Sequence, residues 1–385
     1  MKIVFFSNYM NHHQESVSNE LYRLTDGNYY FVACEEFDEK RLSLGYEDMN
    51  KRYDFIIRPY EDKEQEKLAL NLALDADVMI FGSGNRKYLN ARMKQKKLAF
   101  MYSERLYKKG FNLIKLLPRV YRAYLTSRRC RKNNLHMLCA SAYTPLDMNR
   151  FFEFNKLYKW GYFPEVTTYS DVNALIEQKK KNSIVWVARF IDWKHPEIPV
   201  EIAKHLKADG YDFGLKMIGS GEELEKIKAM VERENLEDVV DIAGSMSPIE
   251  VRKNMEESEI FLTTSDKQEG WGAVLNESMN SACAVVASHA IGSAPFLIND
   301  GENGFIYQDG NFEDVCKKIK YLLDNPKKRK ELSKNAYDTM ISEWNPENAA
   351  KKVLELSEYL LNGNNGTPFK NGVCSKAEIL KDDWM

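Results

Sequence analysis

A short apolar run, two glycines and a helical repeat, in that order, constrain this chain more than any other stretch. Glu259-Ile-Phe-Leu-Thr-Thr264 is rich in β-branched and aromatic residues, which predicts a buried strand. Residues 273–282 place apolar and small side chains at helical spacing. Gly270 and Gly272 lie between the two, where a chain leaving a strand must turn sharply and a ligand can approach the backbone. The segment therefore predicts a strand, a tight turn and a helix.

Two carboxylates flank this turn. Glu269 is expected in the loop at the carboxyl end of the strand, and Glu277 about a turn and a half into the helix. The helix N-terminus between them offers free N–H groups and a positive dipole end, which suit a phosphate. Carboxylates touching that phosphate would repel it, so they are better placed to accept hydrogen bonds from hydroxyls on either side. A ligand with hydroxyls on both sides of its phosphates is a nucleotide sugar.

Length and composition limit the class of protein. A chain of 385 residues exceeds the size of one usual hydrophobic core, so two domains are expected. Hydrophobic residues make up 44%, and 55 basic residues nearly balance 57 acidic ones, as in a soluble globular protein. No apolar run approaches the ~18 residues that a membrane span needs. The start of the chain predicts a buried strand and not a signal peptide, so we expect a cytoplasmic protein.

The cysteines give no sign of a disulfide framework or a metal site. All six lack paired spacing, and no Cys-x-x-Cys occurs. They indicate reduced, mostly buried thiols.

The first half of the chain alternates between strand and helix patterns. Residues 15–24 and 64–74 have helical periodicity between predicted strands. This alternation favours an α/β fold with a parallel sheet whose ligands bind at the carboxyl ends of the strands. The predicted strands are 2–6, 29–33, 54–57, 78–81, 98–102 and 136–139.

The loops at that edge carry candidate acceptor-side residues. His12 and His13 follow the first strand in a polar loop suited to a sugar hydroxyl, with surface histidines near a helix start as an equal alternative. Gly82 follows the fourth strand in a loop of small residues. Asp75-Ala-Asp77 contains an Asp-x-Asp pattern, but it precedes a strand, so it is interpreted as a helix end and not as a metal site.

The fifth strand leads into Ser103, Glu104 and Arg105. A charged pair at such an edge is more typical of binding than of packing, although a structural salt bridge from Glu104 to Arg105 or a neighbour is the main alternative. Residues 105–143 then contain ten Lys or Arg and no acid. The basic amphipathic part, 105–132, predicts contact with an anionic membrane surface, against the alternative of a solvated helix face. Nucleic acid is disfavoured because the whole chain is slightly acidic and has no nucleic-acid motif.

The second half places further polar groups after its strands. Arg189 ends a strand and Lys194 lies five residues later, a pair of cations suited to a pyrophosphate. Residues 213–218 predict a strand that ends in a tight turn containing Gly219 and Gly221, where the backbone can approach a phosphate or a base. A further strand, 239–244, ends at Gly244, with Met246 just beyond it.

Glu269 and Glu277, with seven residues between them, resemble the E-x7-E motif of retaining glycosyltransferases with the GT-B fold, the group 1 (GT4) family. The order and separation of five segments resemble this family over almost all of 183–345, and the aromatic segment 156–164 resembles its surface and capsular polysaccharide members. The resemblance implies two Rossmann-like domains facing across a cleft, with the last helix crossing back to the N-terminal domain. It also implies that catalysis needs no metal.

The resemblance assigns roles to particular residues. Arg189 and Lys194 would hold the diphosphate, Glu269 the transferred sugar, Glu277 the ribose, and Glu104 would lie near the acceptor. Seven further residues would complete the donor site around the base and the motif loop: Gly219, Gly221, Gly244, Met246 and the run Gly270-Trp271-Gly272. Glu269, Glu104, Arg189 and Lys194 are the expected catalytic set.

The expected layout is an acceptor domain over 1–164, with a returning helix over 346–361, and a nucleotide-sugar-binding domain over 182–345. A linker is expected over 165–181 and a loosely held tail over 362–385. The expected reaction is transfer of a hexosyl group from a nucleotide sugar, with UDP favoured as the nucleotide, to a saccharide. The anomeric configuration is expected to be retained. A lipid-linked acceptor on the inner face of the membrane would give the basic segment a partner.

Two other functions fit the sequence less well. A Rossmann oxidoreductase is disfavoured because neither half has a dinucleotide fingerprint. A non-catalytic nucleotide-sugar-binding or glycan-binding subunit need not keep all of Arg189, Lys194, Glu269 and Glu277. The chain also departs from the family's usual Gly at Ala282 and Pro at Ala284, changes expected to affect local stability more than chemistry.

Overall fold

The chain divides into two compact α/β units. In this computed structural model the described residues are 1–37, 47–109, 134–149 and 156–385. Unit 1 comprises Met1–Glu165 and Asn345–Lys381, and unit 2 comprises Val166–Trp344 and Asp382–Met385. Residues 166–181, where the sequence predicted a linker, lie in unit 2, where helix α7 (Val172–Gln178) forms. Most of the basic segment, residues 110–132, lies outside the described residues, so its membrane contact stays a prediction.

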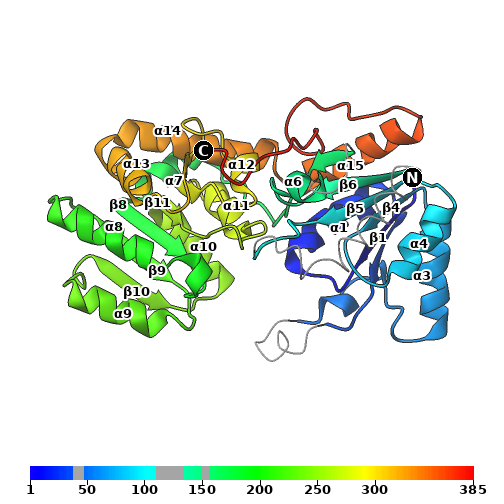
Figure 1. The fold of residues 1–385 in the computed structure, drawn as a ribbon, viewed down its shortest axis with the longest axis horizontal. Helices are drawn as coiled ribbons and strands as arrows, with labels where there is room; N and C mark the ends of the chain where they lie inside the picture. Colours follow the sequence, from blue (N-terminus) through cyan, green and yellow to red (C-terminus); the bar gives the residue numbers. More distant parts are fainter. Residues whose placement is uncertain (38–46, 110–133, 150–155) are drawn as a thin grey trace. The chain divides into compact units, whose positions relative to one another are not determined.

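Unit 1 is built on a parallel sheet with the strand order β3-β2-β1-β4-β5-β6-β7. Helices α3 and α4 cover one face, and α1 and α15 pack together on the other (Figure 1). The strands are β1 (Ile3–Ser7), β2 (Tyr29–Ala33), β3 (Ile56–Ile57), β4 (Val78–Phe81), β5 (Ala99–Ser103), β6 (Leu135–Cys139) and β7 (Leu157–Lys159). The helices are α1 (His12–Leu24), η1 (Met49–Lys51), α3 (Lys63–Asp75), α4 (Arg86–Lys94), α6 (Thr144–Asn149) and α15 (Pro346–Leu361).

The sequence predicted six of these strands and missed β7. Leu157–Lys159, to which the sequence analysis assigned no strand, pairs in parallel with β6. The strand is too short for its periodicity to be recognised. Helix α15, where the sequence predicts the returning helix, belongs to unit 1 and packs against α1.

The tail was predicted to be loosely held, and this is wrong for residues 373–377. Val373, Cys374 and Ala377 are at most 3% exposed. The backbone there bonds to the free edge of β7, through Cys374 N–H to Lys159 O at 2.8 Å and Ala377 N–H to Leu157 O at 3.0 Å. Three small apolar side chains in a polar tail gave the sequence too weak a signal, while the unpaired sheet edge supplied a partner.

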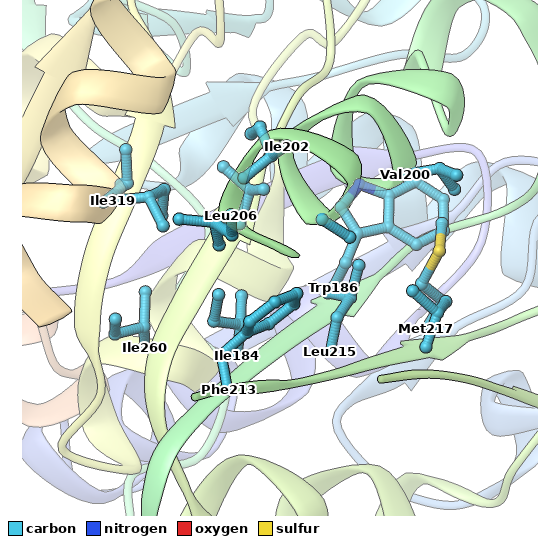
Figure 2. Close-up of a cluster of buried hydrophobic side chains, with 14 of the residues drawn as sticks. Ile184, Trp186, Val200, Ile202, Leu206, Phe213, Leu215, Met217, Ile260 and Ile319 are labelled. Atoms are coloured by element: carbon cyan, nitrogen blue, oxygen red, sulfur yellow. The ribbon is translucent and has the colours of Figure 1, made fainter. Parts of the chain in front are cut away.

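Unit 2 has a parallel sheet with the order β10-β9-β8-β11-β12-β13. Its core lies on the face covered by α8, α9 and α13, where the indole of Trp186 lies beside Val200 and Met217 (Figure 2). The strands are β8 (Lys180–Val187), β9 (Gly214–Ile218), β10 (Val240–Gly244), β11 (Ser258–Thr263), β12 (Ala284–Ser288) and β13 (Phe305–Tyr307). The remaining helices are η2 (Asp192–Lys194), α8 (Glu197–Ala208), α9 (Leu224–Arg233), α10 (Pro248–Glu257), α11 (Ala273–Asn280), α12 (Ala294–Leu297), α13 (Phe312–Asp324) and α14 (Pro326–Ser342).

Ala282 stands at a position that favours glycine. Its φ is +52°, in the left-handed region that costs an alanine about 1 kcal/mol or more. Its methyl group is fully buried and packs with Ile176 and Tyr337. The buried methyl offsets the backbone strain by about 0.8 kcal/mol, which explains how the chain tolerates alanine here.

Within the described residues, no helix is both long and apolar enough to span a membrane. The five cysteines in the same part of the chain are free thiols, and all except Cys34 are buried.

A buried lysine ties together the elements that carry the motif loop. The Lys179 ammonium donates to four backbone carbonyls, of Met255, Glu256, Ser258 and Ser281, at 2.9–3.0 Å. These carbonyls lie at the end of α10, at the start of β11 and just after the end of α11. Burial lowers the pKa of Lys179, yet four acceptors satisfy its charge.

We expect Lys179→Met to lower the free energy of unfolding by about 2–4 kcal/mol, because several buried carbonyls lose a charged donor at once. Chemical denaturation of unit 2 measures this loss. The neighbouring Lys180→Met is the matched control, since Lys180 makes only an exposed ion pair with Glu257 and should cost less than about 1 kcal/mol. Equal losses in the two variants would show that the carbonyl cluster does not stabilise the unit.

Candidate active site

The motif loop has the geometry that the sequence predicts. Glu269 lies in the loop after β11, and Glu277 lies on α11. Gly272 is the N-cap of α11, with φ +87°. A Cβ added there would lie 3.0 Å from Ile291 Cγ2 and 3.2 Å from Glu269 Cγ, so a side chain would be both strained and crowded. Glycine thus lets the loop fold back next to the Glu269 carboxylate.

Trp271 holds this loop from inside the core. Its indole is fully buried, donates from Nε1 to Asn276 Oδ1 at 2.9 Å, and packs near Phe296 and Trp344. The sequence predicted a donor contact for Trp271, but its buried side chain has a structural role, which leaves the backbone to meet a ligand.

Glu269 forms an ion pair with Lys194 across two adjacent strand ends. The side chains are only 15% and 11% exposed. Strands β8 and β11 are paired, so the loops that follow them emerge side by side at the carboxyl edge of the sheet. The sequence predicted both residues for one site, and the structure brings them into contact.

Trp193, which the sequence analysis missed, contacts both predicted cations. Its ring centre lies 4.5 Å from Lys194 Nζ and 5.8 Å from Arg189 Cζ, within the range of cation–π attraction. The only signal in the sequence was an aromatic residue directly before Lys194. Both cations therefore contact the same ring.

Hydrogen bonds from the residues after β11 fix the turn that carries Trp193. Thr264 Oγ1 donates to Lys194 O at 2.6 Å and accepts from the buried Trp186 Nε1 at 2.9 Å. Asp266 N–H donates to Trp193 O at 3.0 Å. The core residue Trp186 thus positions the cations through the end of β11.

Glu277 is partly buried on the second turn of α11. Burial raises the pKa of its carboxyl, and the guanidinium of Arg252 acts in the opposite direction. Arg252 itself donates to Asn280 Oδ1 at 3.0 Å. A carboxylate that lacks full hydration gains from hydroxyl donors, which fits the predicted contact with a ribose.

The glycines after β9 are required by packing between loops. Gly219 and Gly221 have φ +141° and +157°, and an added Cβ would lie 1.9 Å from Ala188 O and 2.2 Å from Phe190 O, respectively. Phe190 also bonds to this turn through its N–H to Ser220 O at 2.9 Å. The turn is thus pressed against the loop that carries Arg189. Gly244, at the end of β10, is joined to the same turn, because its carbonyl accepts from Gly219 N–H at 2.8 Å. Met246 lies next to Asn254.

Unit 1 contains a second polar site at the carboxyl ends of β1, β4 and β5. A cavity of about 400 Å³ is lined by Ser7, Asn8, Asn11, Gln14, Gly82, Ser83, Tyr102, Ser103, Glu104, Arg105 and Tyr162. It includes the predicted Gly82, Ser103 and Glu104. His12 and His13 are not part of the lining, although the ring of His13 stacks on Tyr162 with centroids 4.8 Å apart.

The predicted alternative for Glu104, a salt bridge to Arg105 or a neighbour, is confirmed for a neighbour: Glu104 pairs with Lys108 and not with Arg105. Glu104 accepts from Tyr162 Oη and from Lys108 Nζ. Arg105 instead points to the buried Asp147, with Nη2 to Oδ1 at 3.8 Å. Adjacent residues on an extended segment point to opposite sides, which separates the two charges.

Another cavity, of about 530 Å³, opens at the amino ends of β8, β9 and β10. It lies at the opposite edge of the sheet from Glu269, and both of its lysines pair with acids of the same lining, Lys216 with Asp241 at 3.4 Å and Lys180 with Glu257 at 2.6 Å. We assign it no role in the site. Among the described residues, no group of three or more His, Cys, Asp or Glu side chains is placed to hold a metal ion.

Comparison with known proteins agrees with this arrangement. Residues 170–339 match the family model described as glycosyl transferases group 1. An uncharacterised glycosyltransferase of Methanocaldococcus jannaschii is 30% identical over 172 residues, 44% of this chain and 47% of that protein. The poly(ribitol-phosphate) alpha-N-acetylglucosaminyltransferase of Staphylococcus aureus is 27% identical over 171 residues, 44% of this chain and 34% of that protein. The chain spans about half or less of the length of these relatives.

Solved structures match over nearly the whole chain. Anabaena HepE in complex with UDP superposes with a TM-score of 0.69 and 15% identity, covering 92% of this chain and 99% of that one. TarM superposes with a TM-score of 0.65 and 14% identity, covering 93% and 99%. The fold is GT-B. The predicted α/β class with two parallel sheets is thereby confirmed.

We expect Gly221→Ala to destabilise unit 2 by about 3 kcal/mol or more, because the added methyl would overlap the carbonyl of Phe190. Thermal or chemical unfolding measures the loss. Gly210→Ala is the matched control: its φ is also positive, at +79°, but no atom lies within 4 Å of the added Cβ. It should cost only about 1 kcal/mol, and equal losses would argue against the packing role of Gly221.

Proposed function

We propose that this chain is a retaining glycosyltransferase of the GT4 type that moves a hexosyl group from a UDP-linked sugar to a saccharide acceptor without a metal ion. Three findings support the proposal. Residues 170–339 match the group 1 model, several relatives are named as glycosyltransferases, and structural neighbours include complexes with UDP.

The observation that carries the proposal is the cluster of Arg189, Lys194, Trp193 and Glu269 at the carboxyl edge of the second sheet. Transfer breaks the bond between the anomeric carbon and the β-phosphate oxygen, and the bonding electrons stay on the phosphate. Two cations on one rigid turn can stabilise this developing charge in place of a metal. The N-terminus of α11 adds free N–H groups to the same edge.

The two glutamates have different roles in this mechanism. Glu269 accepts hydrogen bonds from hydroxyls of the transferred sugar, while its contact with Lys194 keeps that cation close to the diphosphate. Glu277 accepts hydrogen bonds from the ribose hydroxyls. The acceptor binds in the polar cavity of unit 1, next to Glu104.

The acceptor that we propose is a lipid-linked saccharide of surface polysaccharide assembly, at the inner face of the membrane. A relative from Salmonella typhimurium named as a putative colanic acid biosynthesis glycosyltransferase supports this class, at 25% identity over 141 residues. The basic segment 105–132 would bind the anionic membrane surface.

We expect isothermal titration in EDTA to show UDP binding to the purified protein, and weaker or no binding of NAD. Arg189→Ala and Glu277→Gln should each weaken UDP binding by about tenfold or more, because each removes a charged partner. NAD binding alone, or no binding of UDP, GDP and ADP, would rule out the proposed donor site. UDP binding that disappears in EDTA would exclude the metal-free mechanism.

Glu277 should also give UDP binding a pH dependence. Burial raises the pKa of its carboxyl, so the ionised form that accepts ribose hydrogen bonds is lost as pH falls through that raised value. UDP affinity should therefore fall on the acid side. Glu277→Gln cannot titrate, so it isolates this effect from the titration of the UDP phosphate.

We expect Trp193→Ala to raise the KM for the donor by about tenfold, with a smaller change in kcat, because Arg189 and Lys194 lose the ring that holds them. Trp193→Phe keeps an aromatic face and should recover most of the affinity. Trp193→Leu is the control for simple filling of space. If Trp193→Leu recovers the donor KM as well as Trp193→Phe does, the ring does not act by positioning the cations.

A further inference from the structure

Among the described residues, the cavity of unit 1 offers no unbalanced charge to a ligand. Within the described part of the chain, its lining contains one acid and one cation, Glu104 and Arg105. Each is already matched by a partner of opposite charge. Glu104 contacts Lys108, and Arg105 faces Asp147.

Arg105 borders the cavity, but its charge faces the buried Asp147. Its side chain is 2% exposed, and that of Asp147 is fully buried. The guanidinium lies over the ring of Tyr143, with Cζ 4.9 Å from the centroid. Asp147 Oδ2 also accepts from the backbone N–H groups of Leu106 and Tyr107, at 2.7 and 3.1 Å. Turning Arg105 towards an anion would leave a buried carboxylate without its cation, which is costly.

The rest of the polar lining consists of hydroxyls and amides that already form a chain of hydrogen bonds. Gln14 Nε2 donates to Ser7 Oγ at 3.3 Å, and Ser7 Oγ donates to Asn8 Oδ1 at 3.2 Å. Asn8 N–H donates to Ser83 Oγ at 2.7 Å. Each of these side chains has both donor and acceptor capacity. Such groups match hydroxyls, which also donate and accept.

Glu104 is the strongest acceptor in this lining, and its orientation is fixed. Tyr162 Oη donates to Oε1, while Lys108 Nζ binds Oε2. Tyr162 is in turn held by stacking against His13. The carboxylate keeps further lone pairs for a hydroxyl, because each oxygen accepts more than one hydrogen bond.

We propose that this cavity binds an uncharged polyhydroxyl group, a sugar residue without phosphate, with Glu104 accepting a hydrogen bond from one of its hydroxyls and Tyr162 positioning that carboxylate. The assignment of this sugar as the glycosyl acceptor rests on the proposed function. The proposal separates this chain from relatives named for polyol phosphates, such as the poly(ribitol-phosphate) and poly(glycerol-phosphate) transferases.

Saturation-transfer NMR with the full-length protein tests the proposal. The probes are the methyl glycosides of glucose, galactose and N-acetylglucosamine, with ribitol 5-phosphate and glycerol 3-phosphate as anionic competitors. We expect at least one glycoside to bind in a saturable manner, and both phosphates to bind at least about tenfold more weakly. Glu104→Ala should abolish glycoside binding, and Tyr162→Phe should weaken it.

Glu64→Ala is the control variant, because Glu64 is an exposed acid on α3 of the same unit. It should leave glycoside binding unchanged. Ser83→Lys, which adds an unmatched cation to the cavity, should favour ribitol 5-phosphate over the glycosides. The proposal is overturned if the phosphates bind as tightly as the glycosides, if no glycoside binds, or if Glu104→Ala has no effect.

Titration of the same protein samples with UDP distinguishes the two proposals. Glu104→Ala should retain UDP binding, because Glu104 belongs to unit 1 and the proposed donor groups to unit 2. Glycoside binding without UDP binding would refute the proposed function and leave the cavity assignment intact. UDP binding without glycoside binding would refute the cavity assignment and leave the proposed donor site intact.

Discussion

The ion pair between Lys194 and Glu269 is the interaction on which the donor half of the proposed mechanism depends. It forms because β8 and β11 are neighbours in a parallel sheet, so that their following loops meet at one edge. Thr264 and the buried Trp186 fix the backbone beneath it. A cation held in this way lies beside an acid before any ligand arrives, and an incoming diphosphate can share it at little cost of reorganisation.

The two units use charge in opposite ways. In unit 2, Arg189 and Lys194 both contact one aromatic ring, which keeps two like charges close together at the edge of the sheet. In unit 1, the charged residues of the cavity are matched within the protein, and hydroxyls and amides supply most of the remaining lining. The first arrangement suits a charged diphosphate, and the second suits a neutral sugar.

Several residues of the motif region act through packing. Trp271 is buried beneath the loop, Lys179 joins the ends of α10 and α11, and the glycines after β9 allow close contact with the loop of Arg189. These positions keep the polar groups in place without touching a ligand through their side chains. Ala282 shows the tolerance of this framework, since a buried methyl group offsets the strain of a left-handed backbone.

The sequence alone determined the order of most strands and helices, because periodicity and turn residues are local signals. It also placed Arg189, Lys194, Glu269 and Glu277 at strand ends and on a helix, since the topology of a parallel sheet brings such ends to one edge. Only the tertiary structure decided which partners these groups have. The pairing of Glu104 with Tyr162 and the docking of residues 373–377 on β7 join residues from distant segments. The contacts of Trp193 with two cations, and of Glu104 with Lys108, depend on how each loop folds. Such contacts depend on the packed geometry of the chain, which no local pattern encodes.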